Sequence, residues 1–340
     1  MNSKQIIKRS PSNIAIVKYW GKHGNQFPNN PSISFTLTNC FTETKVTYKN
    51  AERQCDETEF VPMDFYFEGK ENPAFKTKIQ KYLQNNAEYF SFLKGLHLNI
   101  ESYNSFPHSS GIASSASSMS ALILCLLEIK YEGSELNLQE ASYLSRLASG
   151  SAARSVYPLM TLWGETPSLS DSSDEFAIPI GDMIHPIFKS YHDTILIVSS
   201  KEKSVSSRAG HSLMNNHPMA EQRYSSARKN TEDLLTVLKQ GDLESFIKIA
   251  EDEANQLHDL MASSTPSYTL KEPNTINIIN EIIKFREETC LPVCYTLDAG
   301  PNVHLLYPDS CSEKVHVFIE EVLKNYCFNN KFIDDIVNNG

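Results

Sequence analysis

The feature that most constrains this chain is a run of small residues that leads directly into an apolar helix. Residues 107–116 read Pro-His-Ser-Ser-Gly-Ile-Ala-Ser-Ser-Ala, and residues 117–130 repeat apolar side chains at helical spacing. Small residues let a backbone approach a ligand closely, and the N-terminus of a helix attracts anionic oxygens. A serine-capped helix after an ordinary turn would have a similar sequence, because serine is a favoured N-cap residue. The run predicts a buried helix preceded by either a phosphate loop or a simple turn, and it lacks the Gly-Lys-Ser/Thr of a Walker motif.

The length of 340 residues suggests about two domains, and a hydrophobic content of 40% is enough for substantial cores. The longest uninterrupted apolar run, Ala121–Leu127, is far shorter than the roughly 20 residues that cross a bilayer. No signal-like apolar segment follows Met1. We therefore expect a globular, soluble and cytoplasmic protein with no membrane partner.

Charge and cysteine content narrow the classes of partner and metal site. The formal net charge of -10 argues against binding to duplex nucleic acid, which needs a basic face, so any anion must be bound by a local cluster. The seven cysteines are scattered and odd in number, which argues against a disulfide framework. Cys290 and Cys294 are separated by three residues and lack a histidine pair, so they do not predict structural zinc.

Periodicity divides the chain into two halves with different patterns. The first half predicts a mixed sheet with covering helices, with strands at 13–17, 32–37, 44–48 and 96–102 and helices at 75–90, 117–130 and 138–147. The second half predicts long helices at 219–239, 243–262, 275–287 and 312–324, with strands at 193–199, 293–297 and 303–307. We place a domain boundary near residue 190, which gives domains at 1–190 and 191–340.

An apolar run near the N-terminus ends in a cluster of lysines and aromatic residues. Residues 13–22 read Asn-Ile-Ala-Ile-Val-Lys-Tyr-Trp-Gly-Lys, so Lys18 and Lys22 flank Tyr19 and Trp20. In an acidic chain this local positive charge could form an anion pocket, although lysines at a strand end are commonly solvated. Both interpretations stay open on these residues alone.

Two further segments carry chemistry that suits anions and proton transfer. Residues 149–155 read Ser-Gly-Ser-Ala-Ala-Arg-Ser, and Arg154 could hold an oxyanion with two parallel hydrogen bonds. Residues 293–304 predict a strand that ends at Asp298 before a Gly-Pro turn, a common place for a side chain to project into a cleft. A helix-capping turn at 149–155 and a turn-capping role for Asp298 are the structural alternatives.

These segments together resemble the diphosphomevalonate decarboxylase family of the GHMP kinase superfamily. The loop at 107–116 resembles the superfamily's central phosphate loop, and residues 13–22 resemble the family signature N-I-A-x-x-K-Y-W-G-K. Residues 149–154 match S-G-S-A-x-R, and residues 295–302 match Y-T-x-D-A-G-P-N. A fourth segment, 203–211, resembles V-S-S-x-x-G-M, but His211 stands where the family usually has methionine, which leaves the packing of this loop open. The resemblance extends from residue 11 to about residue 308.

The resemblance implies an α+β fold of the GHMP kinase type. It comprises an N-terminal domain like the second domain of ribosomal protein S5 and a ferredoxin-like C-terminal domain, with the active site between them. The implied reaction is the ATP- and Mg²⁺-dependent conversion of mevalonate 5-diphosphate to isopentenyl diphosphate, ADP, phosphate and carbon dioxide. Relatives of this kind are often homodimers, so the resemblance raises the same expectation here.

The resemblance also assigns roles to residues. It implies catalytic roles for Asp298, Lys18 and Arg154, with Asp298 at the hydroxyl that accepts phosphate and Arg154 at the substrate carboxylate. It implies substrate binding by Tyr19, Lys22, Ser149, Ser151, Arg154 and Arg208. It implies ATP binding by Pro107, Ser109, Ser110, Gly111, Ile112, Ala113, Ser114 and Ser115, with Ser115 at the magnesium ion.

Related activities on the same fold are the alternatives. They are decarboxylation of a mevalonate monophosphate, phosphorylation by a mevalonate 3-kinase without decarboxylation, and ligand binding without turnover. The presence of Asp298, Lys18 and Arg154 together argues against the kinase without decarboxylation. A binding protein that had lost turnover would be expected to have lost the phosphate loop or the aspartate, and this chain has both.

Overall fold

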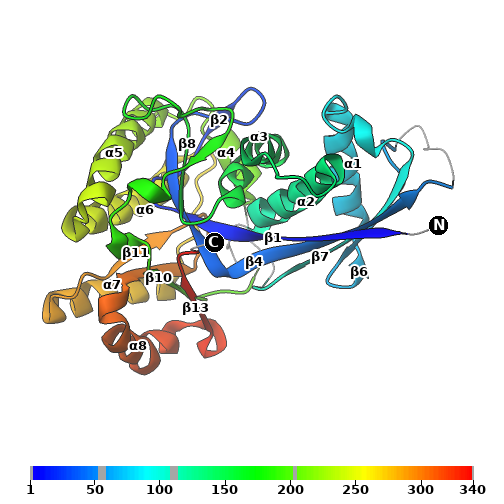
Figure 1. The fold of residues 1–340 in the computed structure, drawn as a ribbon. Coiled ribbons are helices and arrows are strands. Elements are labelled where there is room, and N and C mark those ends of the chain that lie inside the picture. Colours follow the sequence, from blue (N-terminus) through cyan, green and yellow to red (C-terminus); the bar gives the residue numbers. More distant parts are fainter. Residues whose placement is uncertain (1–2, 53–58, 108–113, 202–204, 339–340) are drawn as a thin grey trace.

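The computed structural model describes residues 3–52, 59–107, 114–201 and 205–338, and its two main sheets divide the chain between residues 179 and 191 (Figure 1). The first sheet has the strand order β6-β5-β7-β4-β8-β9, with β1 also paired to β4. Its strands are β1 (Lys4–Ala15), β4 (Ser32–Asn50), β5 (Met63–Phe67), β6 (Lys70–Glu71), β7 (Leu96–Asn104), β8 (Met160–Trp163) and β9 (Ala177–Pro179). A separate two-stranded sheet joins β2 (Lys22–His23) to β3 (Phe27–Pro28).

Strand β4 organises the first sheet, because it pairs with β1, β7 and β8 along its 19 residues. Apolar periodicity predicts two separate strands here and only the last residues of β1. Both strands are longer because their backbones pair in a continuous ladder, and their outer faces carry charged side chains that form ion pairs, such as Arg9 to Glu43 and Lys45 to Glu101. Apolar periodicity does not detect such a strand, although its inward-facing residues still alternate with these charges.

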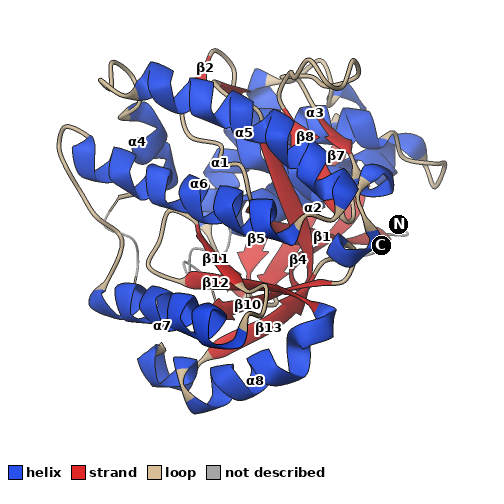
Figure 2. Cartoon of the chain, turned by 90° about the vertical axis from the view of Figure 1, so that its left-hand side faces the viewer, coloured by secondary structure: helices blue, strands red, loops and turns tan. Residues whose placement is uncertain are grey.

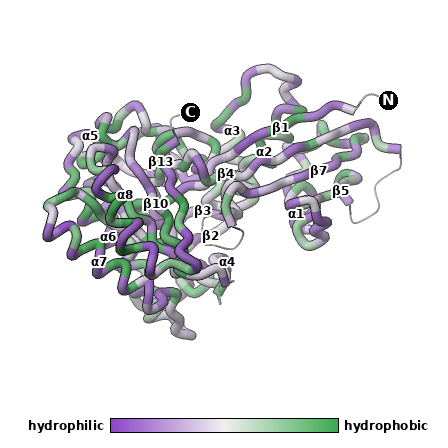
Figure 3. The backbone as a smooth tube through the Cα atoms, turned by 90° about the horizontal axis from the view of Figure 1, so that it is seen from below, coloured by the Kyte–Doolittle hydropathy of each residue, from purple (hydrophilic) through white to green (hydrophobic). Residues whose placement is uncertain are grey.

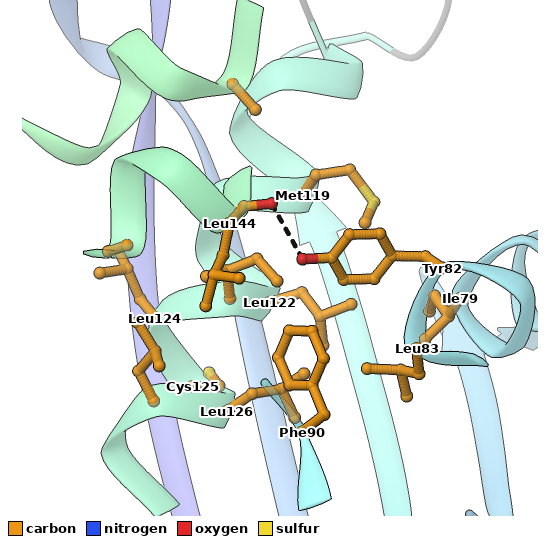
Figure 4. Close-up of a cluster of buried hydrophobic side chains, with 14 of the residues drawn as sticks. Ile79, Tyr82, Leu83, Phe90, Met119, Leu122, Leu124, Cys125, Leu126 and Leu144 are labelled. Atoms are coloured by element: carbon orange, nitrogen blue, oxygen red, sulfur yellow. Dashed lines mark hydrogen bonds between the residues drawn. The ribbon is translucent and has the colours of Figure 1, made fainter. Parts of the chain in front are cut away.

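Helices α1 (Pro73–Asn85), α2 (Ser114–Tyr131) and α3 (Leu138–Ala148) pack against the first sheet. Figure 4 shows the core between them, where Tyr82 lies against Met119 and Leu122 and donates a hydrogen bond to the Leu144 carbonyl at 2.9 Å. Asn72 caps α1 by accepting a hydrogen bond from the Phe75 amide. The helix predicted at 75–90 ends five residues early. Helix α2 confirms the buried helix that the sequence predicted after the small-residue run.

The second sheet has the order β11-β12-β10-β13, and all of its neighbouring strands are antiparallel. Its strands are β10 (Tyr191–Leu196), β11 (Cys294–Leu297), β12 (Val303–Pro308) and β13 (Phe332–Ile336). Strand β10, the first of the four in sequence, lies between β12 and β13. Helices connect β10 to β11 and β12 to β13. This arrangement is the split β-α-β pattern of a ferredoxin-like domain.

Helices cover both faces of the second sheet (Figure 2). Helices α5 (Ala220–Gln240) and α6 (Leu243–Ser263) pack on the face that also meets β4, and α7 (Pro273–Thr289) and α8 (Ser312–Glu321) pack on the other. Ile195 joins the first of these cores and Leu196 the second, as the alternation of a strand requires. In Figure 3 helices α5, α6 and α7 alternate between hydrophilic and hydrophobic residues, as expected for helices with one buried face.

The C-terminal segment, which apolar periodicity does not predict as a strand, ties the two sheets together. Strand β13 belongs to the second sheet, but Val337 forms a bridge with Leu37 of β4. The carboxylate of Asp335, itself only 2% exposed, accepts hydrogen bonds from three consecutive amides of β4, those of Thr38, Asn39 and Cys40, at 2.7–2.9 Å. The sheets are therefore fixed relative to each other by charge-assisted hydrogen bonds as well as by apolar packing.

Mixed helices and sheets confirm the α+β class. One hydrophobic cluster contains residues of both sheets, including Phe35 and Ile195, so the two halves of the chain share part of their core. The domain boundary near residue 190 stays a prediction. None of the helices described is both long enough and apolar enough to span a bilayer.

We expect Asp335→Asn to destabilise the fold. An amide keeps one acceptor oxygen but places an NH2 group against an N–H of β4, so a buried donor is left without an acceptor. The free energy of unfolding should fall by about 1–3 kcal/mol in urea titrations followed by circular dichroism. The control is Asp334→Asn, because the half-exposed Asp334 accepts a bond from the Thr194 hydroxyl that an amide oxygen can keep. Equal losses in both variants would contradict this role of Asp335.

Candidate active site

A cavity of about 490 Å³ lies where the ends of the two sheets meet, and it collects most of the predicted site residues that the structure describes. The first sheet contributes residues that follow β1, together with the starts of α2 and of the 3-10 helix η2 (Gly150–Val156). The second sheet contributes Asp298, and α4 (Ser207–Ser212) contributes Arg208 and His211. Among the described residues, the cationic side chains that line the cavity are Lys18, Lys22, Lys78, Arg154 and Arg208.

Lys18 and Asp298 form an ion pair across the junction of the two sheets. Lys18 follows the end of β1, and Asp298 follows the end of β11. The Lys18 ammonium donates to Oδ1 of Asp298 at 3.2 Å, with the Lys18 side chain 2% exposed and the Asp298 side chain 26% exposed. Burial lowers the pKa of Lys18, and the Asp298 carboxylate opposes that shift. The structure therefore brings together the predicted carboxylate and a buried ammonium, with the carboxylate still open to the cavity.

Arg154 lies in η2, close enough to Asp298 for the two charges to interact. Burial lowers the pKa of Arg154 to about 10, and the nearby Asp298 carboxylate opposes this shift. The guanidinium therefore stays charged at neutral pH. Its Nη1 donates to the Ser32 hydroxyl, and its Nε has no hydrogen-bond partner among the residues that the structure describes.

Tyr19 and His211 pack together at the cavity wall. Their rings lie 4.4 Å apart between centroids, and the His211 ring lies 4.7 Å from that of Trp20. His211 Nδ1 accepts a hydrogen bond from the Gly21 amide at 3.0 Å, and burial lowers the pKa of His211 to about 3. The structure therefore shows how His211 packs at the position where the family usually has methionine: its neutral imidazole lies against the rings of Tyr19 and Trp20.

Gly150 is needed for the position of Tyr19. A Cβ atom at Gly150 would lie 2.7 Å from the Tyr19 hydroxyl, closer than any real contact allows.

The Tyr19 hydroxyl oxygen and Oδ1 of Asn13 are buried and, like Nε of Arg154, have no hydrogen-bond partner in the described part of the chain. Buried polar atoms are normally satisfied, so three such atoms around one cavity point to a polar ligand.

Serine hydroxyls gather at the N-terminus of α2. Ser114 and Ser115 open the helix, and the Ser115 hydroxyl lies 3.2 Å from that of Ser149, while Ser151 lines the cavity nearby. Pro107 is described but does not line the cavity. The predicted ATP-binding residues Ser109, Ser110, Gly111, Ile112 and Ala113 lie outside the described residues.

The same hydroxyls fit a magnesium ion held mainly by a ligand. The described residues contain no group of three His, Cys, Asp or Glu side chains that could bind a metal by themselves. Mg²⁺ in nucleotide sites commonly takes most of its ligands from phosphate oxygens and water. Ser115 at a helix N-terminus is compatible with that coordination.

Lys22, Arg208 and Lys78 supply positive charge at the outer part of the cavity. Lys22 donates to Gln26 at 2.8 Å, and Arg208 is exposed. Burial lowers the pKa values of both Lys22 and Lys78, and the positive charge of Arg208 lowers them further. Mutually repelling cations that face one cavity are a physical reason to expect a polyanionic ligand.

Lys78 is a charged residue of the cavity wall that the sequence did not predict. It lies on α1, whose sequence predicts only an amphipathic helix, and its ammonium lies 5.2 Å from the centre of the Phe75 ring on the same helix. No local motif distinguishes Lys78 from Lys76 or Lys81, because only the tertiary arrangement brings it to the cavity.

We expect Lys78→Gln to weaken binding of inorganic diphosphate. Removing one charged donor should raise the dissociation constant by about fivefold to tenfold, since hydrogen bonds to charged groups are worth roughly 1.5–3 kcal/mol when buried and less here. Isothermal titration calorimetry measures the change. The matched control is Lys81→Gln, an exposed lysine on the same helix that does not line the cavity. A loss of affinity in the control equal to that in Lys78→Gln would show a nonspecific charge effect instead.

Two family models match consecutive parts of the chain. Residues 10–174 match the diphosphomevalonate decarboxylase-like N-terminal domain, and residues 194–339 match the mevalonate 5-diphosphate decarboxylase C-terminal domain. The diphosphomevalonate decarboxylase of Saccharomyces cerevisiae is 29% identical over 322 residues, which cover 91% of this chain and 79% of the relative. That of Candida albicans is 28% identical and covers 90% of this chain and 85% of the relative.

Solved structures agree with these matches. The mevalonate diphosphate decarboxylase of Staphylococcus aureus superposes with a TM-score of 0.85 at 26% identity, covering 100% of this chain and 97% of that one. The enzyme of Legionella pneumophila gives a TM-score of 0.78 at 29% identity, with coverage of 97% and 100%. These structures confirm the predicted GHMP kinase fold. The sequence motifs, the cavity and both family models agree, and the chain belongs to the diphosphomevalonate decarboxylase family.

Proposed function

We propose that this protein catalyses the ATP-dependent decarboxylation of mevalonate 5-diphosphate to isopentenyl diphosphate, in the mevalonate route of isoprenoid biosynthesis. The observation that carries the proposal is the convergence of Asp298, Lys18 and Arg154 on one cationic cavity between the two sheets. Family membership supports the same reaction. The cysteines that the structure describes are all free, which supports a cytoplasmic location, where disulfides are rare.

The first step is transfer of the γ-phosphoryl group of ATP to the tertiary C3 hydroxyl. An O–P bond forms at C3, the bond to the ADP oxygen breaks, and the hydroxyl proton leaves. Asp298 orients the hydroxyl and accepts its proton, and Lys18 offsets the negative charge beside it. Phosphoryl transfer depends mainly on positioning and charge stabilisation, which a fixed ion pair supplies.

The second step is elimination of phosphate and carbon dioxide. The C3–O bond breaks and phosphate leaves with its electron pair, and the bond between C2 and the carboxylate carbon supplies the electrons of the new double bond. Arg154 holds the carboxylate so that this bond stays aligned with the leaving phosphate. The buried guanidinium with an unpartnered Nε suits this role, because it is charged and has donor capacity to spare.

The remaining cavity residues bind the two phosphorylated groups. Tyr19, Lys22, Ser149, Ser151 and Arg208 retain the 5-diphosphate, and binding energy from that group is used at the distant reacting carbon. The loop at 107–115, with Ser114 and Ser115 at the start of α2, binds the ATP phosphates, and Lys78 adds charge near them. Ser115 would help to hold Mg²⁺, which when bound would neutralise phosphate charge.

A ligand-bound structure of a relative is compatible with these assignments. One solved protein of the same fold, in complex with MVAPP, AMPPCP and magnesium, superposes with a TM-score of 0.81 at 24% identity. The two mutually repelling cations assigned to the substrate tail, Lys22 and Arg208, favour a 5-diphosphate over a monophosphate. A homodimer stays a prediction.

The test is incubation of purified protein with ATP, Mg²⁺ and each of mevalonate, mevalonate 5-phosphate and mevalonate 5-diphosphate. ADP and carbon dioxide are followed separately. We expect both products, in equal amounts, from the 5-diphosphate. ADP without carbon dioxide would indicate a 3-kinase, preference for the 5-phosphate would indicate the monophosphate enzyme, and binding without either product would contradict catalysis.

We expect Arg154→Gln to leave the fold and ATP binding nearly intact and to lower turnover by about two powers of ten. Glutamine lacks the charge that holds the carboxylate, and loss of a charged partner in a site commonly costs a few kcal/mol. Steady-state assays of carbon dioxide release measure the effect. Arg228→Gln is the control, because Arg228 lies outside this cavity. Turnover of Arg154→Gln within about twofold of wild type would remove Arg154 from the mechanism.

Asp298→Asn is nearly isosteric and removes the carboxylate charge. We expect kcat to fall by about three orders of magnitude with much smaller changes in both KM values, because the interaction matters mainly in the transition state. ADP and carbon dioxide release should fall together, since phosphorylation precedes elimination. The control is Asp259→Asn, an exposed carboxylate of α6.

The same variant separates catalysis from turn capping. A capping role would cost about 0.5–2 kcal/mol of stability and leave activity near normal. A kcat within about tenfold of wild type, in protein shown to be folded by its thermal melt, would therefore overturn the assignment. Stoichiometric ADP without carbon dioxide would place Asp298 in the elimination step instead.

A further inference from the structure

Two charged side chains outside the cavity hold the backbone of Lys18. Oε2 of Glu253, on α6, accepts a hydrogen bond from the Lys18 amide at 2.8 Å. Nη2 of Arg223, on α5, donates to the Lys18 carbonyl oxygen at 3.0 Å. Nδ2 of Asn30 donates to the same carbonyl oxygen, also at 3.0 Å. Arg223 and Glu253 together still bind both main-chain polar groups of Lys18.

Arg223 and Glu253 also bind each other in the interior. Their side chains are 1% and 0% exposed, and two guanidinium nitrogens donate to the two carboxylate oxygens at 2.8 and 2.5 Å. Asn230 donates to Glu253 at 2.7 Å, and Arg223 donates to Gln256 at 3.0 Å. A buried ion pair is often no more stable than apolar residues of similar volume. Fold stability alone therefore gives a weak explanation for this pair.

Lys18 lies at the point where the backbone hydrogen bonds to strand β4 end. The preceding amides of Ile16 and Val17 donate to the Ile33 carbonyl, whereas the Lys18 amide donates to Glu253. From this point the side chain must reach Asp298 of the other sheet through a buried path. The negative charge of Glu253 also raises the pKa of Lys18, which opposes the effect of burial.

Helix α6 contacts the other member of the catalytic pair as well. Nε2 of His258 lies 3.2 Å from the Asp298 carbonyl oxygen, to which it can donate. Burial lowers the pKa of His258 to about 4, so the ring is neutral at physiological pH and one nitrogen carries a proton. A single helix therefore contacts the backbones of both Lys18 and Asp298, which come from different sheets.

We propose that Arg223 and Glu253 are positioning residues for the reaction, which fix the Lys18 ammonium against Asp298 and the reacting oxygen by holding the Lys18 backbone. This inference rests on the proposed function. It assigns neither residue a contact with substrate. Displacement of a reacting group by about 1 Å can cost roughly a hundredfold in rate, so small backbone shifts at Lys18 are expected to be visible in kcat.

The test is the double variant Arg223→Met/Glu253→Leu, which replaces the buried pair with apolar residues. Relief of ion-pair desolvation offsets loss of the hydrogen bonds, so the thermal midpoint should fall by no more than about 5 °C. We expect kcat to fall by about tenfold to a hundredfold, with both KM values within about threefold of wild type. The KM values are retained because Lys22, Arg208 and the loop before α2 are unchanged.

The matched control is Arg286→Met/Glu251→Leu. This pair also joins α6 to a neighbouring helix through two hydrogen bonds, at 2.6 and 3.1 Å, but neither residue contacts Lys18. We expect its kcat to stay within about threefold of wild type. An equal loss of kcat in both double variants would show general loosening of α6 and overturn the proposal. A folded Arg223→Met/Glu253→Leu enzyme with wild-type kcat would overturn it too.

Arg223→Lys decides the question if the double variant does not fold. Lysine keeps the charge beside Glu253 but cannot bind both carboxylate oxygens and the Lys18 carbonyl as the guanidinium does. We expect a folded enzyme with kcat lowered by about threefold to thirtyfold and unchanged KM values, and full activity would contradict the proposal. If wild-type protein shows no turnover of mevalonate 5-diphosphate, the proposed function fails rather than the positioning role.

Discussion

The ion pair between Lys18 and Asp298 is the constraint on which the site depends. Each residue follows the last residues of a strand, and the two strands belong to different sheets. A buried ammonium is costly unless a carboxylate lies close to it, so the two sheet ends must be held in one relative position. The cavity, its cationic lining and Arg154 all lie around this junction.

The fold meets this requirement with contacts made far from the cavity. Asp335 binds three amides of β4, and the chain that follows it pairs with β4. At Asn338 the amide donates to the Thr36 carbonyl and the carbonyl accepts from the Leu159 amide. Helices α5 and α6 pack between the two sheets, and both bind the Lys18 backbone. The relative position of Lys18 and Asp298 is thus fixed by the C-terminal segment and by helices α5 and α6.

The sequence predicted the parts of this arrangement that are encoded locally. Three short motifs, at 13–22, 149–154 and 295–302, singled out Lys18, Arg154 and Asp298 through their resemblance to the family, and the structure brings all three to one cavity. Their catalytic roles stay a prediction. Lys78, Arg223, Glu253 and Asp335 were not predicted, since their roles arise from partners that are distant in sequence. Strand β13 and the first half of β1 were missed for a related reason: their charged residues are satisfied by tertiary ion pairs and hydrogen bonds, which a hydrophobic pattern does not record.

The most direct test is a crystal structure of this protein with mevalonate 5-diphosphate and a non-hydrolysable ATP analogue. The quantity to measure is the distance from the Asp298 carboxylate to the C3 oxygen of the substrate. We expect a hydrogen bond of about 2.6–3.2 Å, with the Lys18 ammonium still paired to Asp298 and the substrate carboxylate on Arg154. A C3 oxygen more than about 5 Å from Asp298, with another side chain bound to it, would contradict the account.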